Sequence, residues 1–352
     1  MTAYAIDLFC GIGGLTKGLS LAGINTVAGF DIDESCCFAY EKNNKAKFIR
    51  GDIVSLQGKT LESLYPTNSI RILVGCAPCQ PFSSYTKRYQ KNGSTDEKWN
   101  LLYSFSRLIR EVKPEIVSME NVPGLASKKV FRDFVEALKE LKYYVSSSIV
   151  YCPAYGVPQN RKRLVLLASR YKSIELCPPL YESANYPTVR DAIGDLPVLR
   201  SGERDEKDPL HCACRLSSKN LRRIRQSKPG GTWRDWDEDL QLECHKKKSG
   251  KSYPSVYGRM CWDKPSPTIT TQFYGYGNGR FGHPEQDRAL SLREGAILQT
   301  FPPDYVFRDK EHPSSCREIG IHIGNAVPVE LGYVIGLSIR THLREIEQNG
   351  YK

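Results

Sequence analysis

The sequence predicts an α/β protein in which a parallel sheet is joined to a second, irregular and basic region. Two observations support this prediction. Short apolar runs alternate with helical patterns up to about residue 185, and the regular pattern then breaks down. Alternating strands and helices are typical of a doubly wound sheet, which binds ligands at the carboxyl ends of its strands. A chain of 352 residues is long enough for one large domain with an inserted piece or for two domains.

The alternation begins at the N-terminus. The apolar run 3–9 is followed by the glycine turn 11–14 and by apolar residues at helical spacing, which predicts a strand, a turn and a helix. Later in the chain, further strands are predicted at 25–30, 70–76 and 115–119, and helices at 100–112, 130–142 and 328–347.

Residues 200–259 are irregular and basic. They contain 15 Lys or Arg and nine Asp or Glu, so that this segment carries more than half of the chain's net charge of +11. Such an excess favours a polyanionic partner, most often nucleic acid, although a merely basic surface would give the same count.

Several classes of protein are disfavoured. The N-terminus lacks the pattern of a signal peptide, and no apolar run is long enough to span a membrane. The twelve cysteines are scattered through apolar contexts, which indicates reduced thiols and a cytoplasmic protein.

The glycine turn is a candidate cofactor loop. Glycines allow the backbone to approach a ligand closely, and Asp31 follows Gly11 at the distance usual for an acceptor of ribose hydroxyls. A purely structural turn remains an alternative, because the full dinucleotide-binding pattern is not present.

The segment 75–83 contains the strongest candidate nucleophile. Cys79 lies between Pro78 and Pro81 after a predicted strand, where a rigid loop would present its thiolate. The alternatives are a buried cysteine or a redox pair with Cys76. We favour the nucleophile, because Cys76 continues the apolar strand and is expected to point inward.

The order and spacing of several motifs make the chain resemble the DNA (cytosine-5-)-methyltransferases over nearly its whole length. Ala326 stands where that family often has Ser. The motifs are Asp7-Leu8-Phe9-x-Gly11-x-Gly13-Gly14, Pro78-Cys79-Gln80, Glu120-Asn121-Val122, Gln159-x-Arg161-x-Arg163, Arg288-x-Leu290-x-x-Arg293-Glu294 leading to Gln299-x-Phe301-Pro302, and Gly324-Asn325-Ala326-Val327.

The resemblance implies a fold and a division of the chain. We expect a Rossmann-like methyltransferase sheet in a catalytic domain of residues 1–189, completed by 318–352. Residues 190–317 are expected to form a smaller target-recognition domain that binds DNA.

The resemblance also implies a reaction, the methylation of C5 of a flipped-out cytosine in duplex DNA. Cys79 would add to C6 of the base, Glu120 would donate a proton or hydrogen bond to N3, and Arg163 would stabilise charge at O2. Arg161 would support the catalytic loop or a flanking phosphate.

The implied cofactor is S-adenosyl-L-methionine, with S-adenosyl-L-homocysteine as the product and no metal. Phe9 and Ile32 would contact the adenine, Asp31 the ribose, and Asp52 the adenine amino group. The remaining residues expected to line this site are Asp7, Gly11, Gly13, Gly14, Ile53, Pro78 and Asn325.

The basic region is expected to contact DNA, and base flipping would give the enzyme access to its target. Thr268 and Ile269 resemble the family's element near the flipped base. Lysines 246–248 are further candidates for phosphate contacts, although such a run is usually only solvated. The other expected DNA-contacting residues are Gln80, Ser83, Arg222, Arg223 and Arg225.

A structural zinc site built from His211, Cys212, Cys214, Cys244 and His245 is disfavoured, because the spacing is not that of a zinc knuckle. Two rival functions remain. One is an RNA (tRNA) cytosine-C5 methyltransferase on the same scaffold, and the other is a catalytically inactive DNA-binding regulator. We expect a bacterial or phage-encoded monomer, paired with a restriction endonuclease that acts separately.

Overall fold

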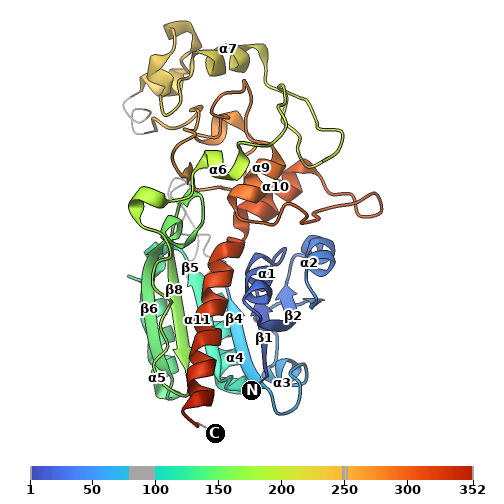
Figure 1. Ribbon diagram of the computed structural model, residues 1–352, viewed down its shortest axis with the longest axis vertical. Helices are drawn as coiled ribbons and strands as arrows, with labels where there is room; N and C mark the ends of the chain where they lie inside the picture. Colours follow the sequence, from blue (N-terminus) through green and yellow to red (C-terminus); the bar gives the residue numbers. More distant parts are fainter. Residues whose placement is uncertain (1, 79–99, 248–249, 251–252, 351–352) are drawn as a thin grey trace. The chain divides into compact units, whose positions relative to one another are not determined.

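The computed structural model describes residues 2–78, 100–247, 250 and 253–350 (Figure 1). The chain divides into two compact units. The first unit comprises Met1–Tyr151, Lys162–Leu180 and Ala326–Lys352, and the second comprises Cys152–Arg161 and Tyr181–Asn325. The edges of these units differ by several residues from the predicted domain boundaries at 189/190 and 317/318. The assignment of catalysis and DNA recognition to the two domains stays a prediction.

The first unit contains a seven-stranded sheet with strand order β3-β2-β1-β4-β5-β8-β6. The strands β1 to β5 run parallel, so their carboxyl ends lie at one edge of the sheet. This result confirms the predicted α/β class. The strands are β1 (Ala3–Leu8), β2 (Asn25–Asp31), β3 (Lys47–Arg50), β4 (Ile70–Gly75), β5 (Ile116–Asn121), β6 (Tyr144–Tyr151) and β8 (Lys162–Ser169).

One strand departs from the predicted parallel sheet. β8 lies between β5 and β6 and runs antiparallel to both. The chain passes from β6 to β8 through only ten residues, which contain the 3-10 helix η5 (Cys152–Tyr155) and the short strand β7 (Gln159–Asn160). A parallel return would need a longer crossover connection, usually a helix, so the short connection reverses the strand direction. The N-terminal end of β8 thereby lies beside the carboxyl end of β5.

The helices of the first unit bury one apolar face each. α4 buries Leu102, Phe105, Leu108 and Val112, which follow the spacing of one helical face, in the same core as the sheet residues Ile6 and Leu73. The helices of this unit are α1 (Gly14–Leu21), η1 (Glu34–Cys36), α2 (Cys37–Asn43), α3 (Gly58–Glu62), α4 (Asn100–Val112), η4 (Pro123–Leu125), α5 (Lys129–Glu140) and α11 (Val329–Gln348).

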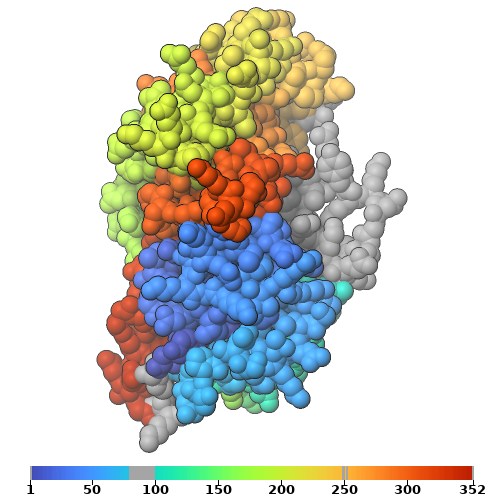
Figure 2. Space-filling model, turned by 90° about the vertical axis from the view of Figure 1, so that its right-hand side faces the viewer, coloured from blue at the N-terminus to red at the C-terminus, as the bar shows by residue number. Residues whose placement is uncertain are grey.

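The C-terminal helix α11 completes the first unit by packing on α1 (Figure 1). A Cβ atom at Gly18 would lie 2.4 Å from the backbone of Tyr333, so glycine permits the two helices to approach closely. On α11, Ser338 also accepts the backbone N–H of Cys177, and His342 shares a hydrogen bond with Ser169 at the end of β8. In Figure 2 the N-terminal segments, coloured blue, form one continuous surface of this unit.

The second unit has little regular structure. Its helices are separated by long turns, and β7 pairs only with β9 (Ser266–Pro267). Buried aromatic side chains such as Trp233, Trp236 and Tyr276 form small cores in place of a sheet. Its helices are η5, η6 (Ser183–Asn185), α6 (Val189–Ile193), α7 (Ser218–Gln226), η7 (Trp233–Asp235), η8 (Glu238–Leu240), α8 (Glu243–Lys246), η10 (Tyr276–Asn278), α9 (Leu292–Leu298) and α10 (Cys316–Asn325).

Among the described residues, no helix is both long and apolar enough to cross a membrane.

Candidate active site

The glycine turn after β1 adopts an unusual backbone. Phe9 has a φ of 61°, which is uncommon for a residue other than glycine, and Gly11 and Gly13 have φ values of 51° and 85°. Gly13 caps α1 in the left-handed conformation and donates its N–H to the carbonyl of Cys10 at 2.9 Å. A Cβ atom at Gly11 would meet no atom within 4 Å, so space is open beside this part of the turn.

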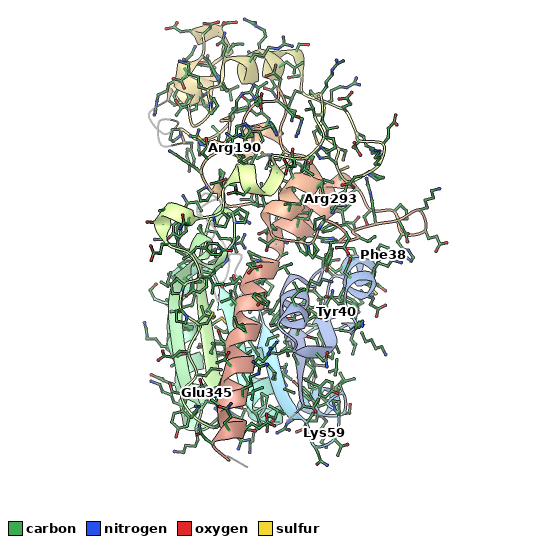
Figure 3. The ribbon with its side chains drawn as sticks, viewed as in Figure 1. Phe38, Tyr40, Lys59, Arg190, Arg293 and Glu345 are labelled. Carbon is green, nitrogen blue, oxygen red and sulfur yellow. The ribbon has the colours of Figure 1, made fainter. Side chains whose placement is uncertain are left out.

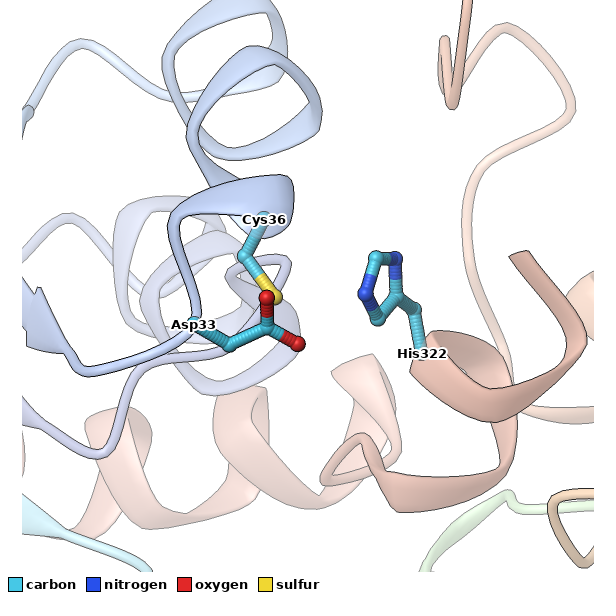
Figure 4. Close-up of side chains that lie close together, drawn as sticks. All are labelled: Asp33, Cys36 and His322. Carbon is cyan, nitrogen blue, oxygen red and sulfur yellow. The ribbon is translucent and has the colours of Figure 1, made fainter. Parts of the chain in front are cut away.

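Asp31 at the end of β2 binds the same turn. Its carboxylate accepts hydrogen bonds from the backbone N–H groups of Gly11 at 2.8 Å and Asp33 at 3.0 Å. The next side chain, Ile32, is 65 % exposed, which is unusual for a large apolar residue. The Asp33 carboxylate accepts from the backbone N–H and the hydroxyl of Ser35 and so caps η1, which contains the buried Cys36 (Figure 4). Asp31 and Ile32 are therefore presented together at the edge of the sheet.

Asp7 is buried below the turn, with 1 % of its surface exposed. One carboxyl oxygen accepts from the Thr16 hydroxyl at 2.7 Å, and Thr16 lies 3.1 Å from the hydroxyl of Tyr40 on α2 (Figure 3). The other oxygen, Oδ1, has no hydrogen-bond partner in the part of the chain that the structure describes. Burial raises the pKa of Asp7 to about 7, an effect that the Thr16 hydrogen bond opposes. A buried carboxyl oxygen without a partner is costly and suggests a ligand group.

Asp52 and Ile53 lie in the turn that follows β3. Asp52 is exposed, and its Oδ1 accepts the backbone N–H of Val54 at 2.9 Å. Ile53 is buried in the core of the first unit. The turn thus offers one carboxylate at the surface and is held by one apolar side chain inside.

Glu120, at the end of β5, is buried and contacts two side chains of the first unit. Arg163, near the start of β8, places Nε 2.8 Å from Glu120 Oε1. Among the described residues, no N–H group is aligned for a hydrogen bond to Oε1. Cys76 donates its thiol to the other oxygen, Oε2, over 2.7 Å. The predicted acid and the predicted cation are therefore adjacent at the edge of the sheet.

Asn121 connects β5 to the segment that follows β4. Its side-chain amide donates to the carbonyl of Ala77 at 3.0 Å, next to the exposed Pro78. The three predicted residues that follow, Cys79, Gln80 and Ser83, lie outside the described residues.

Arg161 belongs to the second unit, where it is buried. Its Nη1 lies 3.5 Å from the carbonyl of Ile269, a long contact for a hydrogen bond, while its backbone carbonyl accepts from Cys152. The Gln159 side chain donates to Leu298 and accepts from the backbone N–H of Ile269. Arg161 and Ile269 therefore lie in the interior of this unit, whereas Thr268 is half-buried and donates its hydroxyl to the carbonyl of Asn160 at 2.9 Å.

Three neighbouring arginines on α7 have different environments. Arg222 and Arg225 are exposed and form ion pairs with Asp239 and Asp287. Arg223 is 5 % exposed, donates to the Leu240 carbonyl at 2.8 Å and lies over the ring of Trp236. Its guanidinium is therefore occupied inside the second unit.

Two other groups of predicted residues have clear positions. Asn325 is the exposed last residue of α10. Of the residues weighed for a zinc site, His211 uses both ring nitrogens in contacts with Ser291 and Pro197, and His245 stacks on Trp233.

Comparison with known proteins places the chain in a family. The C-5 cytosine-specific DNA methylases match residues 4–341. The chain belongs to this family. It is 55 % identical to the Type II methylase M.HgiDII of Herpetosiphon aurantiacus, over 99 % of this chain and 98 % of the relative. It is also 32 % identical to the Type II methyltransferase M.Eco47II of Escherichia coli, over 95 % and 78 % of the two chains.

Solved structures show the same fold. A prophage-encoded Escherichia coli protein described as a DNA modification methyltransferase superposes with a TM-score of 0.71 at 21 % identity, over 97 % of this chain and 99 % of the other. The Schizosaccharomyces pombe Dnmt2 methyltransferase gives a TM-score of 0.63 at 17 % identity, over 97 % and 99 %. The protein is thus a DNA cytosine-5-methyltransferase with a Rossmann-like sheet, as the sequence motifs predicted.

Sequence reasoning assigned no role in this methyltransferase to Cys76, Thr16 or Tyr40. Cys76 points inward, as expected from the apolar strand, but it points at Glu120. Cys76 and Glu120 are 44 residues apart in the sequence, so no local pattern predicted their contact. Thr16 could have been found from its position on the first turn of a helix behind a buried strand-end carboxylate.

Proposed function

We propose that the methyltransferase transfers a methyl group from S-adenosylmethionine to C5 of a flipped-out cytosine in a specific duplex DNA sequence. The single observation that carries this proposal is the buried Glu120, whose Oε1 lies 2.8 Å from Arg163 Nε and accepts no aligned hydrogen bond from the described residues. A buried carboxyl group beside a cation suits a base whose ring gains charge during the reaction.

In the proposed reaction, the Cys79 thiolate adds to C6 of the cytosine and forms a C–S bond. Electron density moves through the ring toward N3, where Glu120 supplies a proton, while Arg163 stabilises O2. C5 becomes nucleophilic as a result. S-adenosylmethionine supplies the electrophilic methyl group. The N3 proton returns to Glu120 after methylation. A base then removes the C5 proton, and the electron pair of that C–H bond restores the ring as Cys79 leaves.

The residues of the first unit fit this cofactor. Asp31 is held by two backbone N–H groups and Ile32 is exposed beside it, which suits a ribose and an adenine face. The unpaired Oδ1 of Asp7 and the open space beside Gly11 suit a ligand at the glycine turn. The other residues proposed to complete the site are Phe9, Gly13, Gly14, Asp52, Ile53, Pro78 and Asn325.

DNA recognition is proposed for the second unit. Arg222 and Arg225 are exposed and would approach phosphates, and the half-buried Thr268 is proposed to lie near the flipped base. The buried Arg223 and Arg161 are proposed to support this unit from inside. Because relatives are named Type II methylases, we also propose that the protein is a monomeric modification enzyme of a restriction-modification system, in which a separate endonuclease cuts unmodified DNA.

A methylation assay tests the substrate. Tritiated S-adenosylmethionine is mixed with duplex genomic DNA or with tRNA, and we expect label in the DNA alone. Label in tRNA alone would overturn the assignment to DNA. Bisulfite sequencing of the DNA product then gives the target sequence.

Trapping on DNA tests the nucleophile. Duplex DNA that contains the methylated target sequence is synthesised with 5-fluorocytosine at the target base. It should form a stable covalent complex with the wild-type protein, because fluorine at C5 cannot leave as a proton does. Cys79→Ala should form no complex. Cys244→Ala, a substitution of an exposed cysteine in the second unit, serves as the matched control and should behave as wild type. Equal trapping by Cys79→Ala would contradict covalent catalysis.

A further inference from the structure

The turn after β3 is held from outside by a side chain that has no role in the proposed site. The turn connects Arg50 to α3 and contains Asp52, which is proposed to bind the adenine amino group, and Ile53, which is proposed to line the cofactor site. Its own hydrogen bonds are few. The backbone carbonyl of Asp52 accepts from Ser55 and Leu56, and its carboxylate accepts from Val54. A short turn with an exposed carboxylate at its tip needs further contacts to keep one conformation.

Arg107 of α4 supplies these contacts. Its Nη2 shares its two N–H groups among three carbonyl groups of the turn, at 3.2 Å to Ile53, 3.2 Å to Val54 and 2.8 Å to Leu56. Several carbonyls therefore converge on one guanidinium nitrogen. Such convergence fixes the direction of each peptide group, because the guanidinium is planar and its donors have fixed directions.

Glu111, one helical turn after Arg107, extends the contact to the end of the turn. Its Oε1 accepts from Arg107 Nη1 at 2.8 Å, and its Oε2 accepts the backbone N–H of Gly58 at 2.6 Å. A Cβ atom at Gly58 would lie 2.5 Å from the Cβ of Glu111, so only glycine permits this approach. The hydrogen bond from Arg107 lowers the pKa of Glu111 below its usual value, which keeps the acceptor charged.

The inner side of the turn is fixed by the core. Ile53 is 3 % exposed and packs in the same cluster as Phe105 and Leu108, which lie on the buried face of α4. The helix therefore holds the turn on two sides, through apolar contacts inside and through the Arg107–Glu111 pair at the surface. Both partners belong to the first unit.

We propose that Arg107 and Glu111 are positioning residues for the adenine end of the cofactor site, acting through the turn that carries Asp52 and Ile53. The proposal rests on the proposed function, in which this turn binds S-adenosylmethionine. Loss of the pair leaves the turn free to adopt several conformations. The ligand must then restrict the turn on binding, and the affinity falls.

The affinity for S-adenosylhomocysteine, measured by isothermal titration calorimetry, tests this proposal. We expect Arg107→Ala and Arg107→Lys to weaken binding about tenfold. KM for S-adenosylmethionine should rise by a similar factor, while kcat changes less than about twofold, because no group of the reacting base is altered. Arg107→Lys retains the charge and the partner Glu111 but cannot reach three carbonyls, so it separates positioning from charge.

The matched control is Arg110→Ala on the same helix. Arg110 is exposed, pairs with Glu140 and has no hydrogen bond to the turn. Its removal should leave the affinity unchanged. A melting curve of each variant without ligand confirms that the fold is kept.

A second ligand shows which group of the cofactor the variant binds less tightly. S-inosylhomocysteine lacks the adenine amino group that Asp52 is proposed to bind. Wild type should prefer the adenine ligand, and Arg107→Lys should lose most of this preference. Wild-type affinity in Arg107→Lys, or an equal loss for both ligands, would overturn the positioning role. Failure of the wild-type protein to bind either ligand would overturn the proposed function itself, and this inference with it.

Discussion

The two units bury charged side chains of different kinds. Among the described residues of the first unit, the buried charged side chains are carboxylates at strand ends, Asp7 and Glu120. In the described residues of the second unit they are four arginines and one glutamate, namely Arg161, Arg223, Arg259, Arg288 and Glu294. The first unit is a regular sheet with helices, whereas the second consists largely of turns.

The difference follows from where backbone groups find their partners. In the sheet, neighbouring strands satisfy the peptide groups, so the architecture does not need a buried charge. In the second unit, Arg259 donates to the carbonyls of Ile224, Ser227, His283 and Gln286 and pairs with Asp287. A buried charge therefore marks the proposed reaction site in one unit and replaces secondary structure in the other.

The largest loss of stability is expected where a buried charge of the second unit is removed. Arg288 and Glu294 form a fully buried pair with two bonds of 2.7 Å. Arg288→Met should lower the free energy of unfolding by about 3–5 kcal/mol, because Glu294 stays buried without its partner. Denaturant unfolding measures the change.

The double variant Arg288→Met/Glu294→Gln is the control for this prediction. It removes the uncompensated charge, and we expect it to recover part of the lost stability. A single variant as stable as wild type would show that the pair does not support the second unit.

Much of the first unit could be predicted from local patterns. The strand over 70–76 and the helix over 100–112 were expected, and β4 and α4 occupy almost the same residues. Strand ends also located Asp7, Asp31 and Glu120, because parallel strands bring their carboxyl ends to one edge. Motif resemblance, rather than periodicity, gave each of these residues its expected role.

The remainder depends on contacts between distant residues. The reversal of β8 is set by a short connection, whereas the strand pattern alone is the same in either direction. In α7, the sequence Arg222-Arg223-Ile224-Arg225 does not distinguish a buried arginine from exposed ones. The position of Trp236 and of the Leu240 carbonyl decides which side chain lies inside. The contact between Cys76 and Glu120 is likewise visible only after β4 and β5 are paired.

A smaller effect with the opposite sign is expected from a buried charge in the first unit. The pKa of Asp7 is raised to about 7, so the folded protein holds a proton on this group more tightly than the unfolded chain does. The stabilising contribution of protonated Asp7 is complete below about pH 4 and is lost as the pH rises through about 7. At pH 8 the free energy of unfolding of Asp7→Asn should therefore exceed that of wild type by about 1–3 kcal/mol. Near pH 4 the two values should differ little.

Melting temperatures from pH 4 to pH 8 test this expectation, and S-adenosylhomocysteine binding shows its functional side. Thr16→Val, which removes the hydroxyl that binds Asp7, is a useful comparison because it should destabilise the protein most at high pH. If Asp7→Asn were less stable than wild type at pH 8, ionised Asp7 would be a structural group like Glu294, and the contrast between the two units would fail.

The smallest change in stability is expected for Arg222→Ala in the second unit. Arg222 is exposed and forms only a surface ion pair with Asp239, so the free energy of unfolding should change by less than about 0.5 kcal/mol. Its proposed contact is a DNA phosphate. Duplex affinity should fall at low salt, and the plot of log affinity against log salt concentration should become less steep by about one.

The neighbouring Arg223→Met should show the reverse pattern, with reduced stability and an unchanged salt slope, because its guanidinium binds the Leu240 carbonyl inside the unit. Fluorescence anisotropy at several salt concentrations measures both variants against wild type. If Arg222→Ala kept the wild-type slope while Arg223→Met reduced it, burial would not separate supporting arginines from DNA-contacting ones, and the proposed use of α7 would have to be abandoned.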